Sequence, residues 1–491
     1  IPATIRGAPH PKTITPRDHP TSECAGPECL RRGAIKSLLD FENRRKIFEI
    51  DATYKFCLLS LVGRASREST ASFAFFLEDI TDLDDSTRVF TLRPDEITGI
   101  NPNTGTLPIF RTRKDADLTL AIHGRLPVLW DETKVNGNIW RITFKNLFNM
   151  TDDSDLFQTK EELEAKGATL HGNVFTLGSE RFSPVYEGKM IYHFDHRWNS
   201  YYGTGNEDRR KLSHLEKQQA AVAATPRYWV AEDGLIPTVR RNVETEIPGA
   251  AVRLAELNWR RNWLCGWRDV TKAVNERTAV PAFLPKVAAG HTLPLMFPQV
   301  SAALTCGLIA AQSSLIFDYV SRQKSDGRHM ALMTWKQLPV PAPESLEPHI
   351  VFIAPRVLEL VYCTYDMVGL AQDLEDYGEP FHWDDGRRAR IRAELDAYFF
   401  HLYGINRSDA DYIQESFQSE TGGLKNNEIA KYGTYRTKNL VLAEYDRMAA
   451  AGVSLENPLI DGENFVSTLT PAPGHGPRHP ARGEMRVDRE S

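Results

Sequence analysis

The segment 186–197 brings two His, an Asp, a Glu, a Lys and an Arg together within twelve residues. Carboxylate and imidazole groups are metal ligands. Glu187-x-Lys189, or His193 with Asp195 and His196, could therefore serve a metal-dependent nuclease. The same charges could instead pair with one another in a polar hairpin. The residue types alone leave both interpretations open.

A third interpretation of this segment is contact with a nucleic acid. Lys189, His196 and Arg197 would face phosphates, and Tyr186 and Phe194 would anchor the segment. Phosphate contacts of this kind fix the position of a protein on a duplex without reading its sequence. We expect Lys189 and Arg197 to bind phosphates in this way.

Arg268, Asn275 and Arg277 form a second donor-rich group. Asn and Arg carry paired hydrogen-bonding groups that match the edges of adenine and guanine in the major groove. We therefore expect base-edge or groove contacts from these three side chains. A surface pair of Arg268 with Asp269, together with a helix cap at Asn275, would explain the same residues equally well.

Arg322, Gln323 and Lys324 form a third group, directly after an apolar segment that ends near Ser313-Ser314. Flexible donors that follow a rigid helix are well placed to reach DNA, so phosphate contacts are expected from Arg322 and Lys324 and a groove contact from Gln323. A solvated basic turn is the alternative.

The elements that must position these groups follow from the apolar pattern. Short β-prone runs separated by polar turns predict strands at 34–41, 54–62 and 72–77. The run 54–62 is apolar on both faces, which is typical of a strand covered on both sides. Residues 203–250 are polar and rich in Gly, Arg and Glu, which indicates a loop or mobile insertion. Helices are expected at 114–126, 159–166, 301–320, 356–374, 387–403 and 437–451, with a short one from Ser408.

Composition sets the class of protein. The chain has 491 residues, of which 41% are hydrophobic and 25% charged, as in ordinary globular proteins with two or three domains. The net charge of −6 argues weakly against a nucleic-acid partner, although a local basic surface would suffice. No apolar run approaches the roughly 18 residues of a membrane span, and no signal pattern begins the chain, so we expect a cytoplasmic protein.

Metal and cofactor signals are weak. Cys24 and Cys29 lack a second Cys/His pair, so no zinc site is predicted. Methylation of adenine requires a Gly-rich loop for S-adenosylmethionine and an Asn/Asp-Pro-Pro-aromatic tetrapeptide that grips the flipped base. The chain contains no Pro-Pro dipeptide, and Gly203-Thr204-Gly205 lies in a polar stretch. No catalytic residue, cofactor-binding residue or metal ligand is therefore assigned.

Several blocks nevertheless resemble large N6-adenine DNA methylases of type IIG-like restriction–modification and related phage-defence systems. The resemblance covers roughly 33–450 in the same order. The blocks that carry it are 34–44, 46–51, 54–57, 101–104 with 108–111, 186–197, 267–269 with 275–278, 317–324, 337–340, 392–396 with 401–404, and 432–438.

The resemblance implies an α/β (mixed α+β) chain that begins with the terminal strands of a Rossmann-like methyltransferase sheet. It implies this sheet and a connecting region at 33–175, a target-recognition domain at 176–340 and a helical domain at 341–465, with a linker near 338–343. Residues 1–32 are expected to be an unrelated leader, and 466–491 a disordered tail.

The function that the resemblance implies is recognition of double-stranded DNA within a bacterial, site-specific adenine methyltransferase. The S-adenosylmethionine loop and the catalytic tetrapeptide would belong to a missing N-terminal half or to another restriction or defence subunit. The alternatives are a non-catalytic scaffold subunit of a defence system and the metal-dependent nuclease.

Overall fold

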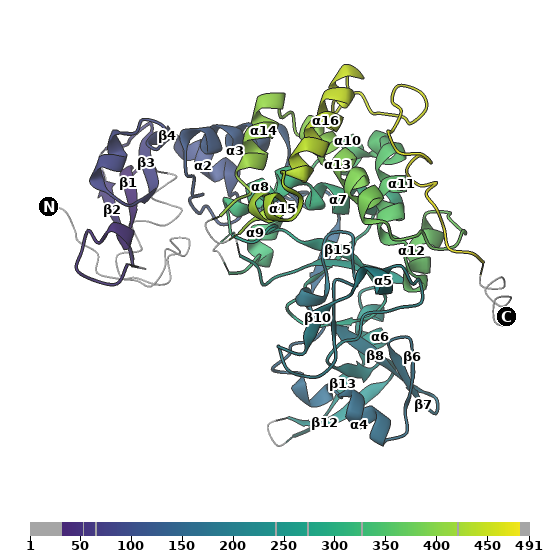
Figure 1. Ribbon diagram of the computed structural model, residues 1–491. Helices are drawn as coiled ribbons and strands as arrows, with labels where there is room; N and C mark the ends of the chain where they lie inside the picture. The colour runs from purple at the N-terminus through teal and green to yellow at the C-terminus, as the bar shows by residue number, and fades with distance from the viewer. Residues whose placement is uncertain are drawn as a thin grey trace. The chain divides into compact units, whose positions relative to one another are not determined.

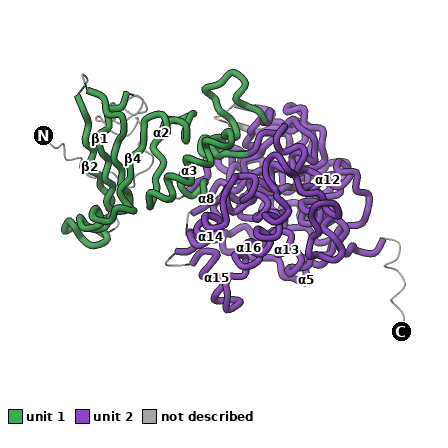
Figure 2. Tube along the Cα trace, turned by 90° about the horizontal axis from the view of Figure 1, so that it is seen from above, with its two compact units in different colours: residues 1–139, 319–327, 331–340 green, residues 140–318, 328–330, 341–491 purple. Residues whose placement is uncertain are grey.

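The computed structural model describes residues 32–52, 54–63, 66–240, 243–272, 274–325, 328–419 and 422–481. It is a mixed α+β fold built from several small sheets and many helices (Figure 1). Two compact units make up the chain (Figure 2). Unit 1 consists of 1–139, 319–327 and 331–340, and unit 2 of 140–318, 328–330 and 341–491. The predicted leader falls almost entirely outside the described residues, and the domain limits at 175/176 and 340/341 stay predictions.

Unit 1 begins with a four-stranded sheet in the order β2-β1-β3-β4. The three predicted strands are confirmed within one residue at each end. β1 and β3 run parallel, whereas β1–β2 and β3–β4 are antiparallel pairs. Phe73, Phe75 and Phe90 pack in the core of this sheet. The strands are β1 (Ile35–Glu42), β2 (Lys55–Leu61), β3 (Ala71–Leu77) and β4 (Phe90–Leu92).

The prediction that the second strand is covered on both sides is wrong. β2 lies at one end of the sheet order, and Leu58 and Leu61 are 54% and 41% exposed. Its apolar run therefore reflects the β propensity of an edge strand rather than burial of both faces.

Helices cover the rest of unit 1. Thr112 caps α3, since its side chain accepts a hydrogen bond from the backbone of Asp115 and its own backbone donates to the Asp115 carboxylate. Tyr319 donates a buried hydrogen bond of 2.7 Å to the same carboxylate. The helices of this unit are α2 (Pro94–Ile100), α3 (Arg113–Arg125) and α9 (Leu332–Lys336), and α8 (Leu315–Arg322) belongs partly to each unit.

The strand-rich part of unit 2 contains two main sheets, in the orders β11-β8-β7-β6 and β15-β14-β17-β5, with β16 pairing with β8. Trp229, Trp263 and Trp267 are buried in them. Their strands are β5 (Ile142–Lys145), β6 (Thr169–His171), β7 (Val174–Leu177), β8 (Glu180–Tyr186), β11 (Trp229–Ala231), β14 (Trp263–Trp267), β15 (Pro281–Pro285), β16 (Ala288–Ala289) and β17 (Leu295–Pro298).

The prediction of a loop or mobile insertion at 203–250 is wrong. The segment contains one strand of a hairpin, a second complete hairpin, a strand of a larger sheet and a four-residue helix, and a further helix begins at its last residue. The elements near it are β9 (Asn199–Tyr201), β10 (Arg209–Lys211), α5 (His214–Lys217), β12 (Leu235–Arg240), β13 (Val243–Pro248) and α6 (Ala250–Ala255). The predicted short helix at 159–166 is confirmed as α4 (Lys160–Ala165), with Thr159 as its cap.

Two of the helices predicted for unit 2 are divided, and two of the observed helices, at 343–346 and 424–432, were not predicted. The helix expected at 301–320 breaks at Ser314, whose ψ of 154° is extended, so α7 (Ala302–Ser313) and α8 are separate. The helix expected at 356–374 is likewise divided into α11 (Ile350–Val361) and α12 (Val368–Asp373). The others are α10 (Pro343–Leu346), α13 (Asp385–Leu402), α14 (Arg407–Glu415), α15 (Leu424–Tyr432) and α16 (Arg436–Ala450).

The segment 466–481, assigned from its composition to a disordered tail, is held against these helices. Gly474 donates a backbone hydrogen bond of 2.8 Å to Glu359. Arg478 forms an ion pair of 2.6 Å with Asp376, and the backbone of His382 donates to Pro477. A Pro- and Gly-rich composition therefore marks irregular backbone here, and disorder does not follow from it.

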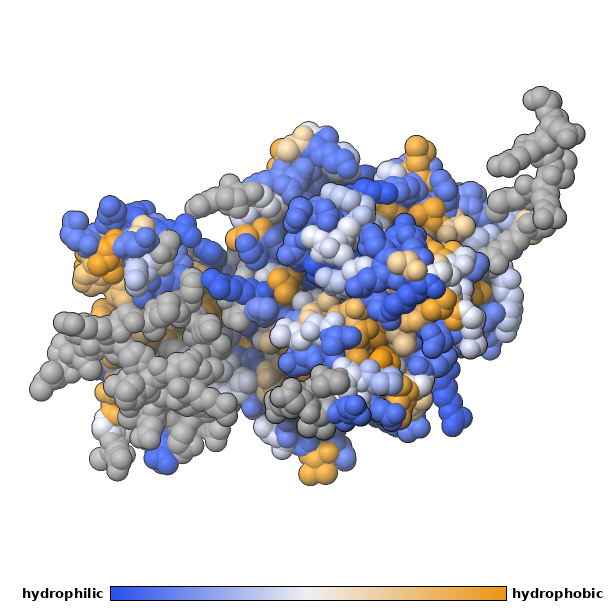
Figure 3. All heavy atoms as spheres, turned by 90° about the horizontal axis from the view of Figure 1, so that it is seen from below, coloured by the Kyte–Doolittle hydropathy of each residue, from blue (hydrophilic) through white to orange (hydrophobic). Residues whose placement is uncertain are grey.

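Charged and polar residues predominate on the face of the protein shown in Figure 3, with hydrophobic residues in small groups between them. Within the described ranges, no single helix has both the length and the apolarity needed to cross a bilayer. α7 and α8 meet that test only when taken together, and they are bent by 55° at their junction.

The helical part of unit 2 depends on a buried arginine. Arg356 is fully buried and lies 2.7 Å from Glu394 and 2.6 Å from Asp461. We expect Arg356→Leu to lower the free energy of unfolding by about 3–5 kcal/mol, because Glu394 would be left as an unpaired buried charge. Arg407→Leu removes an exposed pair with Asp446 and should cost less than about 1 kcal/mol. Urea denaturation of both variants measures the difference, and equal losses would contradict this assignment.

Candidate functional site

The predicted phosphate ligand Arg197 lies in the interior of unit 2. It is 1% exposed, and its guanidinium donates to the backbone carbonyls of Lys217, Gln219 and Val222 at 2.7–3.1 Å. Binding a phosphate would break these three hydrogen bonds. The structure therefore contradicts a phosphate-contact role for Arg197 and gives it a structural one.

His196 is also buried, at 4% exposure, and its Nε2 lies 3.1 Å from Asp366. Asp195, which directly precedes His196, forms a buried ion pair of 2.5 Å with Lys217. Burial raises the pKa of Asp195, but Lys217 outweighs it, so the pKa is lowered overall. These residues are occupied by internal partners, which contradicts a DNA contact through His196.

Arg268 and Arg277 are committed to the protein as well. Arg268 donates to the backbone carbonyls of Gly188 and Ile191, and burial lowers its pKa to about 10. Arg277 lies 2.6 Å from Asp318 and donates to the carbonyl of Ser313. Groove contacts from these two arginines are therefore contradicted. Asn275 is exposed on the same loop, so its predicted contact stays a prediction.

The third predicted group lies in unit 1. Lys324 donates to the carbonyls of Ile100 and Gln337 at 2.8 and 2.6 Å, and burial lowers its pKa well below the ordinary value. A phosphate would have to break both of these hydrogen bonds, so a phosphate contact by Lys324 is contradicted. Arg322 and Gln323 are half-buried, and their DNA contacts stay predictions.

Lys189 is the predicted phosphate ligand that remains at the surface of unit 2. It is half-buried, and its ammonium group donates to Asn206 at 3.0 Å. Burial lowers its pKa, and so do Arg209 and Arg227, while Glu187 acts in the opposite direction. Several cations are therefore concentrated beside Lys189.

These cations belong to a ribbon formed by β9 and β10, which we name the basic ribbon (199–211). Arg209 pairs with Tyr201 and Lys211 with Asn199, so these four side chains share one face of the ribbon. All three residues of β10, Arg209 to Lys211, are exposed. The structure thus presents two adjacent cations, Arg209 and Lys211, on one side of an exposed strand.

Aromatic rings support this face. Lys211 lies 4.3 Å from the ring of Trp198, and Arg227 lies 5.1 Å from the ring of Tyr201. Tyr202, which follows β9 directly, is 69% exposed. An exposed ring beside cations can stack on a base or pack against a sugar, and such pairs recur in proteins that bind nucleic acids.

The opposite face of the basic ribbon is anchored. Arg210 forms a bidentate pair with Glu216 of α5, and Ser213 caps that helix through the backbone of Glu216. Arg227 similarly grips Glu187 with two bonds of 2.7 Å. Hence Glu216 and Glu187 are engaged by Arg210 and Arg227, whereas the ribbon itself carries the carboxylates of Glu207 and Asp208 beside Arg209.

The basic ribbon was not predicted from the sequence, because 203–250 was expected to be a loop. The signal was present as three consecutive basic residues, Arg209-Arg210-Lys211, after a Tyr-Tyr pair. The adjacent block 186–197 was assigned to DNA instead, although that block forms the buried foundation of the ribbon.

Metal and cofactor chemistry find little support in the described residues. They contain no cluster of three or more potential metal ligands, and Glu187, Asp195 and His196 are each bound to internal partners. Gly203-Thr204-Gly205 lies at the tip of the basic ribbon, between two antiparallel strands. A cradle for S-adenosylmethionine requires a strand that leads into a helix, so these glycines do not fit that cofactor.

Comparison with known proteins adds no relative. No protein-family model matches the chain, and no curated protein matches it.

The buried state of Lys324 has a consequence for stability. The pKa of Lys324 is lower in the folded chain than in the unfolded chain, where it is about 10.4. At pH values between these two pKa values, Lys324 binds a proton in the unfolded chain and none in the folded chain. Within this window the free energy of unfolding rises with pH by up to about 1.4 kcal/mol per unit. We expect Lys324→Met to remove that rise, as measured by urea denaturation at increasing alkaline pH. Exposed Lys286→Met is the control, and parallel curves for wild type and Lys324→Met would contradict the assignment.

Proposed function

We propose that this chain holds double-stranded DNA for a bacterial, site-specific adenine-N6 methyltransferase of restriction–modification or phage defence. The observation that carries the proposal is the exposed face of the basic ribbon, with Arg209, Lys211 and the neighbouring Lys189. The resemblance of ordered sequence blocks across 33–450 supplies the methyltransferase context.

The exposed strand β10 suits this task for geometric reasons, whereas β9 beside it is buried. An exposed strand can lie along the phosphates that line the edges of the major groove. Arg209 and Lys211 alternate with Arg210, so their side chains are directed to the same side and can reach one phosphate backbone. Tyr202 at the tip would meet the base edges or the sugars.

Methyl transfer itself belongs to another part of the enzyme under this proposal. S-adenosylmethionine and the tetrapeptide that grips the flipped adenine would come from a separate N-terminal half or subunit. The parallel pair β1–β3 favours our assignment of the first sheet to the end of a Rossmann-like methyltransferase sheet. We place the enzyme in the bacterial cytoplasm with its DNA.

The decisive comparison removes two charges from the ribbon and two from elsewhere in unit 2. Lys145 of β5 and Lys286, which follows β15, are exposed lysines outside the ribbon. The test pair is therefore Arg209→Gln with Lys211→Gln, and the matched control is Lys145→Gln with Lys286→Gln. Both double variants lose the same net charge.

We expect wild-type affinity for a labelled duplex, measured by fluorescence anisotropy, to fall steeply between about 50 and 200 mM salt. The ribbon variant should bind more weakly, and the slope of log affinity against log salt should become shallower by about 2, or roughly 0.9 for each lost phosphate contact. The control variant should keep the wild-type slope.

Two other outcomes favour rival functions. Absence of duplex binding by wild type at low salt would support a scaffold subunit that binds a protein partner. Magnesium-dependent cleavage of a plasmid that disappears in Glu187→Ala would support the nuclease, although Glu187 is held by Arg227 in this structure.

A further inference from the structure

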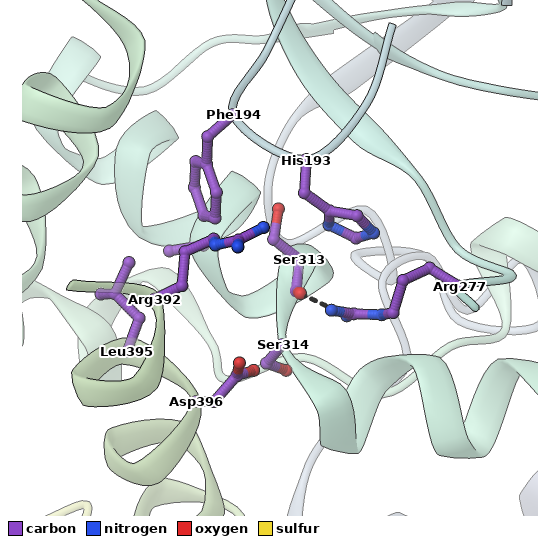
Figure 4. Close-up of a pocket in the computed structure, with 9 residues that line it drawn as sticks. His193, Phe194, Arg277, Ser313, Ser314, Arg392, Leu395 and Asp396 are labelled. Carbon is purple, nitrogen blue, oxygen red and sulfur yellow. Dashed lines mark hydrogen bonds between the residues drawn. The ribbon is translucent and has the colours of Figure 1, made fainter. Parts of the chain in front are cut away.

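A small polar pocket lies inside unit 2, apart from the basic ribbon residues. Its cavity volume is about 10 Å³, enough for about one water molecule, so a larger ligand has to extend through its open mouth. His193, Arg277, Ser313, Arg392 and Asp396 line it, and Figure 4 shows the two arginines approaching Ser313 from different elements. Since these side chains come from α7, α13 and two loops, their polar groups surround the space from several directions.

Arg392 is the unusual member of this set. No hydrogen bond or ion pair joins its guanidinium to any residue that the structure describes, although the side chain is mostly withdrawn from water and burial lowers its pKa. The neighbouring Arg388, one turn earlier on α13, has three donors engaged by carbonyl oxygens and Cys363. Arg392, half-buried and with only the charge of Asp396 beside it, therefore keeps its N–H donors available to an anion.

Two further polar groups point to the same ligand. The hydroxyl of Ser313 is buried and makes no hydrogen bond within the described ranges, and the buried ring of His193 has only the backbone of Ala279 as a partner. His193 is 2% exposed and Ser313 is 4% exposed. Burial and three nearby arginines lower the pKa of His193, with the backbone of Ala279 acting in the opposite direction. A neutral imidazole retains one N–H to donate.

The charges around the pocket balance while Asp396 is ionised, because Arg277 is matched by Asp318 at 2.6 Å and Arg392 faces Asp396. Asp396 accepts a hydrogen bond of 2.7 Å from the backbone of Leu315. Burial raises the pKa of Asp396 to about 6, despite the opposing effect of Arg277 and Arg392. Protonation of this carboxyl therefore leaves a net positive charge around the pocket.

We propose that this pocket binds a phosphate group, with Arg392 as its principal ligand and Ser313 and His193 as further donors. Donors that converge from several directions match the four oxygens of a tetrahedral anion better than the planar pair of a carboxylate. The group can come from free phosphate, from a nucleotide or from a DNA backbone. The proposal is independent of the basic ribbon.

The first experiment measures binding of inorganic phosphate and of sulfate to the whole chain by titration calorimetry. Wild type should bind both, and Arg392→Gln should weaken binding by about tenfold or more, since charge-assisted hydrogen bonds are lost. Arg390→Gln, on the same helix but exposed, should bind as wild type does. Absence of binding by wild type, or equal binding by Arg392→Gln, overturns the proposal.

Thermal unfolding separates a binding role from a structural one. Without added anion, Arg392→Gln should be as stable as wild type or more so, because an unpartnered cation is removed. Phosphate should raise the unfolding temperature of wild type and leave that of Arg392→Gln unchanged. A variant that is destabilised without anion and still responds to phosphate would contradict the proposal.

The source of the phosphate is resolved by adding DNA and nucleotides. If the ligand is a DNA phosphate, Arg392→Gln should weaken duplex binding and free phosphate should compete with the duplex. If it is a free phosphate or nucleotide, that ligand should bind the Arg209→Gln/Lys211→Gln variant normally, and Arg392→Gln should bind duplex as wild type does. Either result supports the pocket, and failure of the ribbon variants leaves this test unaffected.

Sulfate binding should also depend on pH. Asp396, which faces Arg277, Arg392 and Asp318, loses its negative charge as the pH falls through about 6. Because a bound dianion is repelled by the carboxylate, sulfate affinity should rise from pH 8 to pH 5.5. His193 in the same pocket changes affinity in the same direction when protonated. Asp396→Asn should flatten the profile in calorimetric titrations, and an unchanged profile would exclude this carboxyl as the cause.

Discussion

The buried ion pair between Asp195 and Lys217 is the interaction on which the surface of unit 2 depends. Both side chains are at most 7% exposed, and their charged atoms lie 2.5 Å apart. Removing either partner would leave an uncompensated buried charge, so separating the two segments that carry Asp195 and Lys217 costs free energy. Arg197 adds three hydrogen bonds to the carbonyls of Lys217, Gln219 and Val222, and together these contacts fix the end of α5 and the segment that follows it.

The same turn also ties strands to helices within unit 2. His196 contacts Asp366, and Arg388 of α13 donates to the carbonyl of Phe194. Apart from Lys189, the charges of 186–197 therefore face inward and connect the strands to the helices. The donors and acceptors of this inner network are therefore bound to one another. In the outer ribbon, Arg209 and Lys211 face solvent.

Much of the secondary structure could be predicted from local signals. The strand 72–77 and the capped helix after Thr159 have propensities and caps that their surroundings reinforce. The break at Ser314 could not be seen, because its apolar neighbours continue the helical period on both sides. Prediction of the site was poorer. The sequence does not distinguish a donor that faces solvent, such as Lys211, from one that faces carbonyl oxygens, such as Arg197 or Lys324. The difference depends on burial, which is decided by segments distant in the sequence.

The two proposed sites differ in how their cations are used. On the basic ribbon, aromatic rings and exposed cations give a surface for a long, weakly discriminating polyanion. In the pocket, Arg392 lacks a partner within the described chain and sits beside buried donors, which suits one small anion held specifically.

The most direct test of the central claim is a crosslink from the ribbon to DNA. A photoreactive benzoylphenylalanine would replace Tyr202 at the ribbon tip, and in a second protein it would replace Tyr377, which is 81% exposed outside the ribbon. Irradiation with a labelled duplex should yield a covalent protein–DNA product from position 202 and little from position 377. Equal yields from both positions, or no product from position 202, would contradict DNA binding by the ribbon.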